Sequence, residues 1–124
     1  MSADTSQRRV VLVVDDEPFI RINAIDVLTD AGFDVLEAAD ADEALEIIAT
    51  HSKIGVLFTD INMPGSMDGL DLARRVHSMR PDIHLILTSG KVRPNVEQIP
   101  DSGKFIGKPY QERQFVALVQ AAFA

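Results

Sequence analysis

Acidic side chains stand where two apolar runs of the sequence end. Residues 10–14 read VVLVV and lead directly to Asp15 and Asp16, and residues 54–58 read IGVLF and lead to Asp60. Continuous apolar runs of this kind are typical of strands that are buried on both faces. If the two strands are neighbours, three carboxylates meet at one edge of a sheet. Their repulsion would then raise at least one pKa or demand a cation.

Two further polar residues follow apolar runs later in the chain. Thr88 comes after residues 83–87, which read IHLIL, and Lys108 comes shortly after the short run 104–106. Oxygen ligands suit a hard cation such as Mg²⁺, which keeps several waters and accepts one or two carboxylates. Such an ion, together with a lysine ammonium, would neutralise a phosphoryl group, and a hydroxyl would donate a hydrogen bond to it. The residue types therefore indicate a phosphoryl-binding site.

Each of these residues also has an ordinary structural explanation when it is taken alone. Asp15 and Asp16 precede a predicted helix and could cap its N-terminus. Asp60 could form a turn, Thr88 could be a hydroxyl at a strand end, and Lys108 could be a solvated surface charge. A shared site is favoured because all of these residues fall where predicted strands end. The three histidines stand elsewhere, and no glycine-rich nucleotide-binding motif is present.

Strands and helices alternate along the predicted order of elements. Apolar runs predict strands at 10–14, 33–36, 54–58, 83–87 and 104–106. Helical periodicity follows each of them except the fourth, where Pro94 and Pro100 predict a short or irregular helix. This alternation predicts a doubly wound parallel sheet with helices on both faces, although periodicity alone leaves the strand order open. In such folds ligands bind outside the carboxyl ends of the strands.

Local signals predict where the helices begin, end and pack. Pro18 suits the first turn of the first helix, and Gly32 ends that helix. Asp40 and Glu43 resemble a capping box that opens a second helix, which runs to about Thr50. The inner face of the third helix is predicted to be Leu72, Ala73, Val76 and Met79, and that of the closing helix Phe115, Leu118, Val119 and Ala122.

Length and composition narrow the class of protein. A chain of 124 residues suits one domain, here expected at 10–124, with the polar residues 1–9 as a flexible segment. The net charge of −7 disfavours nucleic-acid binding, and no apolar run approaches the ~20 residues that a membrane span needs. The absence of cysteine excludes disulfides and thiolate metal sites, and it favours a cytoplasmic location.

Four motifs occur in order along this framework: VLVVDDEP at 11–18, FTDINMPG at 58–65, LTSG at 87–90 and FIGKPY at 105–110. Together they resemble a bacterial response-regulator receiver domain of two-component signalling. The resemblance extends from residue 10 to residue 123. It implies a flavodoxin-like fold with a five-stranded sheet in the order 2-1-3-4-5, and Mg²⁺ as the cofactor.

The resemblance assigns four residues to the metal site, one of which would also accept the phosphoryl group. Asp60 would be the phosphoacceptor and a metal ligand. Asp16 would bind Mg²⁺ directly, whereas Asp15 would act mainly through water. Asn62 would lend its backbone carbonyl to the metal.

The resemblance also implies a switch. Thr88 would be the switch hydroxyl, Lys108 the phosphate-binding lysine, and Phe105 the aromatic residue whose rotamer follows the switch. The Lys108–Pro109 peptide bond is usually cis in this family. Three features depart from the family pattern. The loop MPGSMDG is one residue longer than usual, Thr88 and Lys108 are unusually close in sequence, and Phe105 lacks the hydroxyl of the more common tyrosine.

The function that the resemblance implies is signalling rather than enzymatic turnover, apart from Mg²⁺-dependent self-phosphorylation and slow autodephosphorylation. A sensor histidine kinase or a histidine phosphotransfer protein would supply the phosphoryl group to Asp60. No output domain follows the motifs, so a stand-alone receiver is expected. It would be a monomer or weak homodimer that acts on an unidentified downstream protein, with neither nucleic acid nor membrane as partner.

Two other classes of protein share parts of the pattern. A haloacid-dehalogenase-like aspartyl-phosphate phosphatase also uses Mg²⁺, Asp and Lys, but it expects D-x-D where this chain has the adjacent Asp15 and Asp16. Turnover of a generic phosphomonoester would favour that class. A flavodoxin-like electron carrier shares the alternation of elements, but acids in its first loop would repel the flavin phosphate. Colourless purified protein would exclude it.

Overall fold

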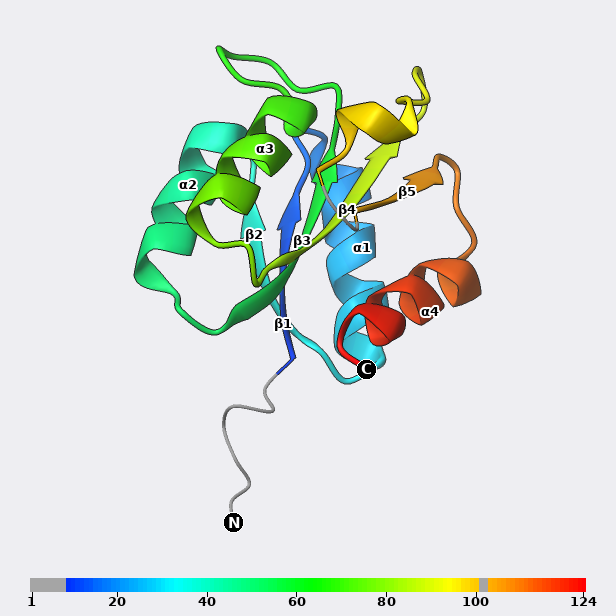
Figure 1. Cartoon of the computed structure of the whole chain (residues 1–124). Coiled ribbons are helices and arrows are strands. Elements are labelled where there is room, and N and C mark those ends of the chain that lie inside the picture. The colour runs from blue at the N-terminus through cyan, green and yellow to red at the C-terminus, as the bar shows by residue number, and fades with distance from the viewer. Residues whose placement is uncertain (1–8, 101–102) are drawn as a thin grey trace.

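A parallel five-stranded sheet forms the centre of the molecule (Figure 1). The computed structural model describes residues 9–100 and 103–124, so the predicted flexible segment 1–9 lies outside it except for Arg9. The strands are β1 (Val10–Val14), β2 (Asp34–Ala38), β3 (Ile54–Asp60), β4 (His84–Ser89) and β5 (Lys104–Gly107). Their order is β2-β1-β3-β4-β5 and every neighbouring pair is parallel, which confirms the predicted fold class and strand order.

Helices cover both faces of this sheet. In the described part of the chain the α-helices are α1 (Pro18–Asp30), α2 (Ala41–Thr50), α3 (Gly69–Met79) and α4 (Glu112–Ala122). Helices α2 and α3 lie on one face, and α1 and α4 lie on the other (Figure 1). None of these described helices combines the length and apolar character needed to cross a bilayer.

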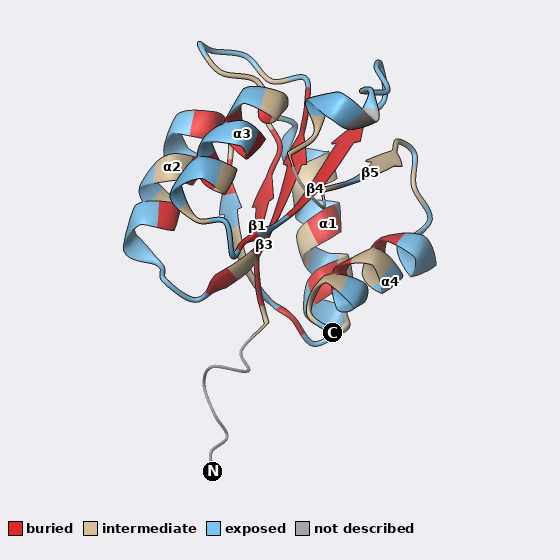
Figure 2. Cartoon of the chain, viewed as in Figure 1, coloured by how far each residue is buried: buried red, intermediate tan, exposed pale blue. Residues whose placement is uncertain are grey.

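Strand β1 shows why the first apolar run is continuous. Leu12 and Val14 join the core beneath α2 and α3, whereas Val11 and Val13 join the core beneath α1 and α4. Successive side chains of a strand point to opposite faces, so a strand between two helical layers needs apolar residues at every position. The whole of β1 is buried (Figure 2).

The predicted beginnings and ends of the first two helices are confirmed, but one capping hydrogen bond has a different partner from the one expected. Pro18 occupies the first turn of α1, and Gly32 follows that helix with a φ of +97°. The Asp40 carboxylate accepts a hydrogen bond from the Glu43 amide at 2.8 Å. The Glu43 carboxylate accepts from the Ala39 amide at 2.7 Å, so the reciprocal bond reaches one residue further than in a standard capping box.

The predicted inner face of α3 is wrong at its last position. Leu72, Ala73 and Val76 are buried, but Met79 is 48% exposed. The next inward position after Val76 belongs to Arg80, whose guanidinium donates to the backbone carbonyls of Ser52 at 3.1 Å and Ile54 at 3.4 Å. This half-buried arginine packs at the C-terminal end of α3 in the place expected for Met79, and Met79 points to solvent.

Four strands, β2 to β5, run further than their apolar runs predict, and two of these extensions carry polar residues of the acid edge. Strand β3 includes Asp60, and β4 includes both Thr88 and Ser89. Asp60 stands in register with Thr88, and the Ile61 amide donates to the Thr88 carbonyl at 2.9 Å. Backbone pairing does not require apolar side chains, so polar residues of the site occupy the last positions of the sheet.

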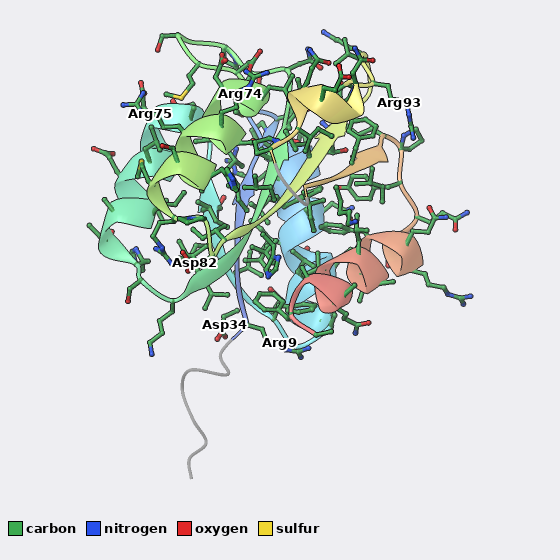
Figure 3. All side chains as sticks on the ribbon, viewed as in Figure 1. Arg9, Asp34, Arg74, Arg75, Asp82 and Arg93 are labelled. Carbon is green, nitrogen blue, oxygen red and sulfur yellow. The ribbon has the colours of Figure 1, made fainter. Side chains whose placement is uncertain are left out.

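The connection between β4 and β5 contains no α-helix in its described residues. It has a single 3₁₀ turn, η2 (Val96–Gln98), which confirms the irregular fourth unit that Pro94 and Pro100 predicted. Arg93 lies at the periphery of the molecule (Figure 3), and its guanidinium carbon stands 5.2 Å from the centroid of the Phe105 ring.

Candidate functional site

Three carboxylates meet at the carboxyl edge of the sheet. Asp60 ends β3, and Asp15 and Asp16 follow β1, which pairs directly with β3. One oxygen from each of the three side chains lies within 4.8 Å of the others. Asp15 is 4% exposed, Asp60 is 5% exposed, and Asp16 is half-buried. The predicted acid cluster therefore exists, and its spacing is consistent with the binding of one divalent cation.

Lys108 lies between two of these acids. Its Nζ is 3.1 Å from a carboxylate oxygen of Asp15 and 3.4 Å from one of Asp60. The Lys108 amide donates to the Ser89 carbonyl at 3.0 Å, which ties the loop after β5 to the end of β4. The Lys108–Pro109 peptide bond is cis, as the resemblance implied. The side chain expected to bind phosphate thus already stands at the carboxylate expected to receive it.

The surroundings of Asp60 oppose its ionisation. Burial raises the pKa of Asp60 above its ordinary value, the ammonium of Lys108 lowers it in part, and the negative charge of Asp15 raises it again. The charged form of a buried carboxylate is disfavoured because low-dielectric surroundings replace water. Any additional cation in this pocket would lower the pKa of Asp60.

Thr88 carries a buried hydroxyl that lacks a partner. The residue is 1% exposed, and its Oγ1 makes no hydrogen bond within the described residues. A buried polar atom without a partner costs about 1–3 kcal/mol and requires an explanation in a folded protein. Thr88 stands in register with Asp60 on the neighbouring strand, so this hydroxyl lies at the same edge of the sheet as the acid cluster.

Asn62 and Ser89 form a contact that sequence reasoning missed. The Ser89 hydroxyl donates to the side-chain oxygen of Asn62 at 2.6 Å. Ser89 belongs to the LTSG motif and Asn62 to FTDINMPG, but no pattern in the sequence signals that the two side chains meet. Asn62 had been singled out by the resemblance for its backbone carbonyl alone.

Arg21 is a second residue that the sequence did not single out. It donates from Nη1 to the backbone carbonyl of Asp15 at 2.6 Å and from Nε to a Glu37 carboxylate oxygen at 2.8 Å. Helix α1 thereby holds the chain just after β1, where the acid pair begins. Arginine at this position has no distinguishing local signal, because its partners are far away in sequence.

Aromatic residues lie on two sides of the site. Phe105 on β5 is half-buried and packs against the core on the α3 side. Tyr110, which sequence reasoning missed, packs edge-on against Phe58 and next to Phe115. Burial first, and then the charges of Asp15 and Asp60, raise the pKa of Tyr110 to about 12. The tyrosine ring therefore lies close enough to the acids to be affected by their charge.

Two adjoining depressions open at this edge. One has a volume of about 540 Å³ and is lined by Asp16, Glu17, Asp60, Asn62, Gly90, Lys91 and Lys108. The other is lined by Phe19, Ile20, Asn23, Gly90, Lys108, Pro109 and Tyr110. Phe19 is 88% exposed, which is unusual for a large apolar side chain. A polar pocket at the acids thus continues into an apolar groove along α1.

The sequence matches the family model of the response regulator receiver domain over residues 11–120. The chemotaxis protein CheY of Thermotoga maritima is 34% identical over 110 residues, which cover 86% of this chain and 90% of that protein. The transcriptional regulatory protein PdtaR of Mycobacterium tuberculosis is 31% identical over 123 residues. That alignment covers 97% of this chain but 59% of PdtaR, so the chain spans about three fifths of this longer relative.

Solved structures agree with this assignment. A response regulator receiver domain protein from Clostridium thermocellum has a TM-score of 0.86 and 25% identity, and the match covers 93% of this chain and 94% of that one. A response regulator receiver protein from Sinorhizobium medicae has a TM-score of 0.82 and 26% identity, with 94% of both chains covered. The chain belongs to the family of response regulator receiver domains, the phosphoaccepting signalling domains of two-component systems.

Proposed function

We propose that Asp60 is the residue that accepts the phosphoryl group and that Lys108 stabilises the group after transfer. The observation that supports this assignment is the position of the Lys108 ammonium, 3.1 Å from Asp15 and 3.4 Å from Asp60. A phosphoryl group on Asp60 would meet this positive charge at once. Lys108 contacts both acids, and we assign Asp60 as the acceptor because it ends the central strand β3.

The transfer is a displacement at phosphorus. A carboxylate oxygen of Asp60 attacks the phosphoryl group of a phosphohistidine, the phosphorus–nitrogen bond breaks, and the imidazole keeps the electron pair and takes up a proton. The attacking carboxylate must be ionised, and Lys108 opposes the rise in the pKa of Asp60 that burial causes. The negative charge that builds up on the phosphoryl oxygens also falls beside the Lys108 ammonium.

Mg²⁺ fits the residues at this edge. The donor atoms are oxygens only, and we assign direct binding to Asp16 and Asp60, a water-mediated contact to Asp15, and a backbone carbonyl contact to Asn62. When bound, the ion would neutralise charge on the phosphoryl oxygens and hold the acids together without mutual repulsion. The same cluster of acids without an ion would repel an incoming phosphoryl group.

The metal assignment predicts that Asp16→Ala weakens Mg²⁺ binding strongly, by about tenfold or more, because a direct carboxylate ligand is lost. Glu112→Ala is the matched control, since this exposed acid lies in the first turn of α4, away from the cluster. Isothermal titration calorimetry with Mg²⁺ measures the affinity of both variants. Equal affinities for the two variants would mean that Asp16 is not a ligand of the metal.

The buried hydroxyl of Thr88 supports a switch. After transfer, Thr88 would donate its hydrogen bond to a phosphoryl oxygen, and the displacement of β4 would alter the packing of Phe105 on the adjacent strand. Leu87 stands in register with Phe105, so movement of Thr88 reaches the aromatic ring through paired backbone. The surface formed by β5 and α4 would carry the signal to a downstream protein.

The apolar groove is where the phosphodonor protein would dock. Phe19 and Tyr110 line it, and it shares Gly90 and Lys108 with the polar pocket. A histidine kinase or phosphotransfer protein that covers Phe19 would place its phosphohistidine over Asp60 and exclude water from the reaction. Exposed aromatic side chains are frequent anchors of protein interfaces.

Other parts of the proposal rest on composition and on the fold. We propose that residues 10–124 form one receiver domain, that it works in the cytoplasm, and that it is a monomer or weak homodimer. Its chemistry would be limited to self-phosphorylation and slow hydrolysis of its own acyl phosphate. The family assignment gives no support to the phosphatase or the flavodoxin alternative.

Incubation with a small phosphodonor and Mg²⁺, followed by intact-mass measurement, tests the proposal. Wild-type protein should gain one phosphoryl group, and the gain should disappear on chelation of the metal. Asp60→Asn should gain none, whereas Asp82→Asn, which alters an exposed acid, should be labelled normally. Undiminished labelling of Asp60→Asn would show that another side chain is the acceptor.

A further inference from the structure

The hydroxyl of Ser89 joins three segments that end at the site. It donates to the side-chain oxygen of Asn62 at 2.6 Å, and it accepts from the amides of Lys91 at 3.0 Å and Val92 at 3.1 Å. One hydroxyl carries one proton and two lone pairs, so these three bonds use its full capacity. Ser89 is 3% exposed, which leaves little room for water to replace any of them.

The partners of Ser89 belong to different parts of the molecule. Asn62 follows Asp60 by two residues and lines the acid pocket together with Asp16. Lys91 and Val92 begin the connection to β5, which lacks an α-helix in its described residues. Among the described residues of that connection, the hydrogen bonds between backbone groups lie at Asn95 and beyond, so the two bonds to Ser89 are a large share of what orders its start.

We infer that Ser89 couples cation binding at the acid cluster to the order of the backbone at Lys91 and Val92. This inference rests on the cation site proposed above, and it assigns Ser89 as a positioning residue. A cation held by the carboxylates and by the carbonyl of Asn62 would fix the backbone of that asparagine. The side-chain oxygen that Ser89 bonds would then be fixed too, and with it the hydroxyl that receives the two amides.

The coupling acts equally in both directions. If cation binding strengthens the Ser89 hydrogen bonds by some factor, then loss of those bonds must lower the affinity for the cation by the same factor. A single buried hydrogen bond contributes about 0.5–1.5 kcal/mol, which corresponds to a change of about two- to tenfold in an equilibrium constant. Ser89→Ala should therefore weaken Mg²⁺ by about that factor, although its side chain is not a ligand.

Amide hydrogen exchange with and without Mg²⁺ tests the inference. In wild-type protein the ion should slow exchange at Lys91 and Val92 by about two- to tenfold. Ser89→Ala should speed exchange at both amides and make it independent of Mg²⁺. Thr50→Ala is the control, because that exposed hydroxyl bonds to carbonyls of α2 and to the neighbouring His51, away from the site.

Asn62→Ala provides a second variant at an exposed position, so the test does not depend on the folding of Ser89→Ala. It keeps the backbone carbonyl but removes the side-chain acceptor. Exchange at Lys91 and Val92 should become insensitive to Mg²⁺, and the double variant with Ser89→Ala should bind Mg²⁺ no more weakly than either single variant. Additive losses would overturn the inference.

The outcomes separate this inference from the cation site on which it rests. Mg²⁺ binding by wild-type protein with no change in exchange at Lys91 and Val92 would overturn the coupling and leave the site intact. Normal Mg²⁺ affinity in Ser89→Ala would do the same. Failure of wild-type protein to bind Mg²⁺ would overturn both.

Discussion

Asp15 and Asp60 are buried side by side with a single lysine between them, an arrangement that favours reactivity over stability. Burial and the negative charge of Asp15 raise the pKa of Asp60, and Lys108 offsets only part of this effect. In the proposed function, an incoming cation and phosphoryl group would relieve this unfavourable arrangement of charges. The buried hydroxyl of Thr88, which has no hydrogen-bond partner among the described residues, also lowers the stability of the folded protein.

Thr88→Val tests that cost. Valine has the shape of threonine without the hydroxyl, so the variant should raise the free energy of unfolding by about 1 kcal/mol in the absence of Mg²⁺ and phosphoryl. Thr59→Val is the matched control, because its buried hydroxyl donates to the Asp60 carbonyl at 3.0 Å and its loss should destabilise the protein. Urea unfolding of both variants measures the difference. Equal destabilisation would mean that the Thr88 hydroxyl has a partner.

Tyr110 reports the charge of the site, because it is the only tyrosine of the chain. Burial, followed by the charges of Asp15 and Asp60, raises its pKa to about 12, against 10.0 for the free side chain. The neutral phenol is thus favoured in the folded state. Its contribution to stability is fully present below about pH 10 and is lost as the pH rises through about 12.

Ultraviolet absorbance at pH 11 measures this shift. With a pKa of about 12 roughly a tenth of Tyr110 should be ionised, compared with roughly nine tenths for an unperturbed tyrosine. Asp60→Asn removes one nearby negative charge and should increase the ionised fraction, whereas Asp82→Asn should not. Circular dichroism must show that the protein is folded at that pH. Near-complete ionisation in the folded wild-type protein would contradict the burial that raises the pKa of Tyr110.

The positions of the residues at strand ends were predictable, because the sequence shows both their types and the apolar runs that they follow. In a parallel sheet the ends of such runs meet at one edge. Asp15, Asp60 and Lys108 were all placed correctly by that rule. Ser89 and Arg21 were not, because their roles depend on partners that are distant in sequence. Met79 was predicted to be buried from spacing alone, and the competing arginine at the end of α3 could not be recognised from periodicity.

At the scale of elements, α3 approaches the end of β3 closely. Gly69 opens this helix, and its amide donates to the Ile61 carbonyl at 2.9 Å. A Cβ at Gly69 would collide with the backbone carbonyl of Asp60 and lie 2.8 Å from the Cα of Ile61. The helix can therefore pack this closely against the end of β3 only with glycine at its start.

Gly69→Ala should accordingly lower the free energy of unfolding by about 2 kcal/mol or more, because the atoms that must move belong to the backbone. It should also reduce phosphorylation, since the displaced carbonyl belongs to Asp60. Gly90→Ala is the control for stability, as its nearest neighbour would be the Lys108 Cβ at an ordinary 3.6 Å. Thermal unfolding compares the two variants, and similar melting temperatures would contradict the close approach.

Local signals in the sequence predicted which helices and strands form more accurately than they predicted where the strands end. Pro94 and Pro100 remove amide donors, and the irregular connection between β4 and β5 is the expected result. Strands β3 and β4 ended later than predicted, because a polar residue such as Thr88 can remain in a ladder that its backbone completes. Hydrophobic periodicity reports burial of side chains, and it does not register this pairing.

At the scale of the whole molecule, strand order decides which residues meet. Placing β1 next to β3 unites Asp15 and Asp16 with Asp60, and placing β5 beyond β4 lets Lys108 reach back to them. Periodicity left that order open, and the resemblance to receiver domains supplied it. The apolar groove along α1 opens at the same edge, so the proposed docking of the donor and the proposed chemistry would share one surface.

The most direct test of this account identifies the phosphorylated residue itself. Protein labelled with a small phosphodonor and Mg²⁺ is reduced with borohydride, which converts an aspartyl phosphate to homoserine, and is then mapped by peptide mass spectrometry. The account predicts homoserine at Asp60 and aspartate at Asp15 and Asp16. Homoserine at either of the two latter positions, with Asp60 unchanged, would contradict it.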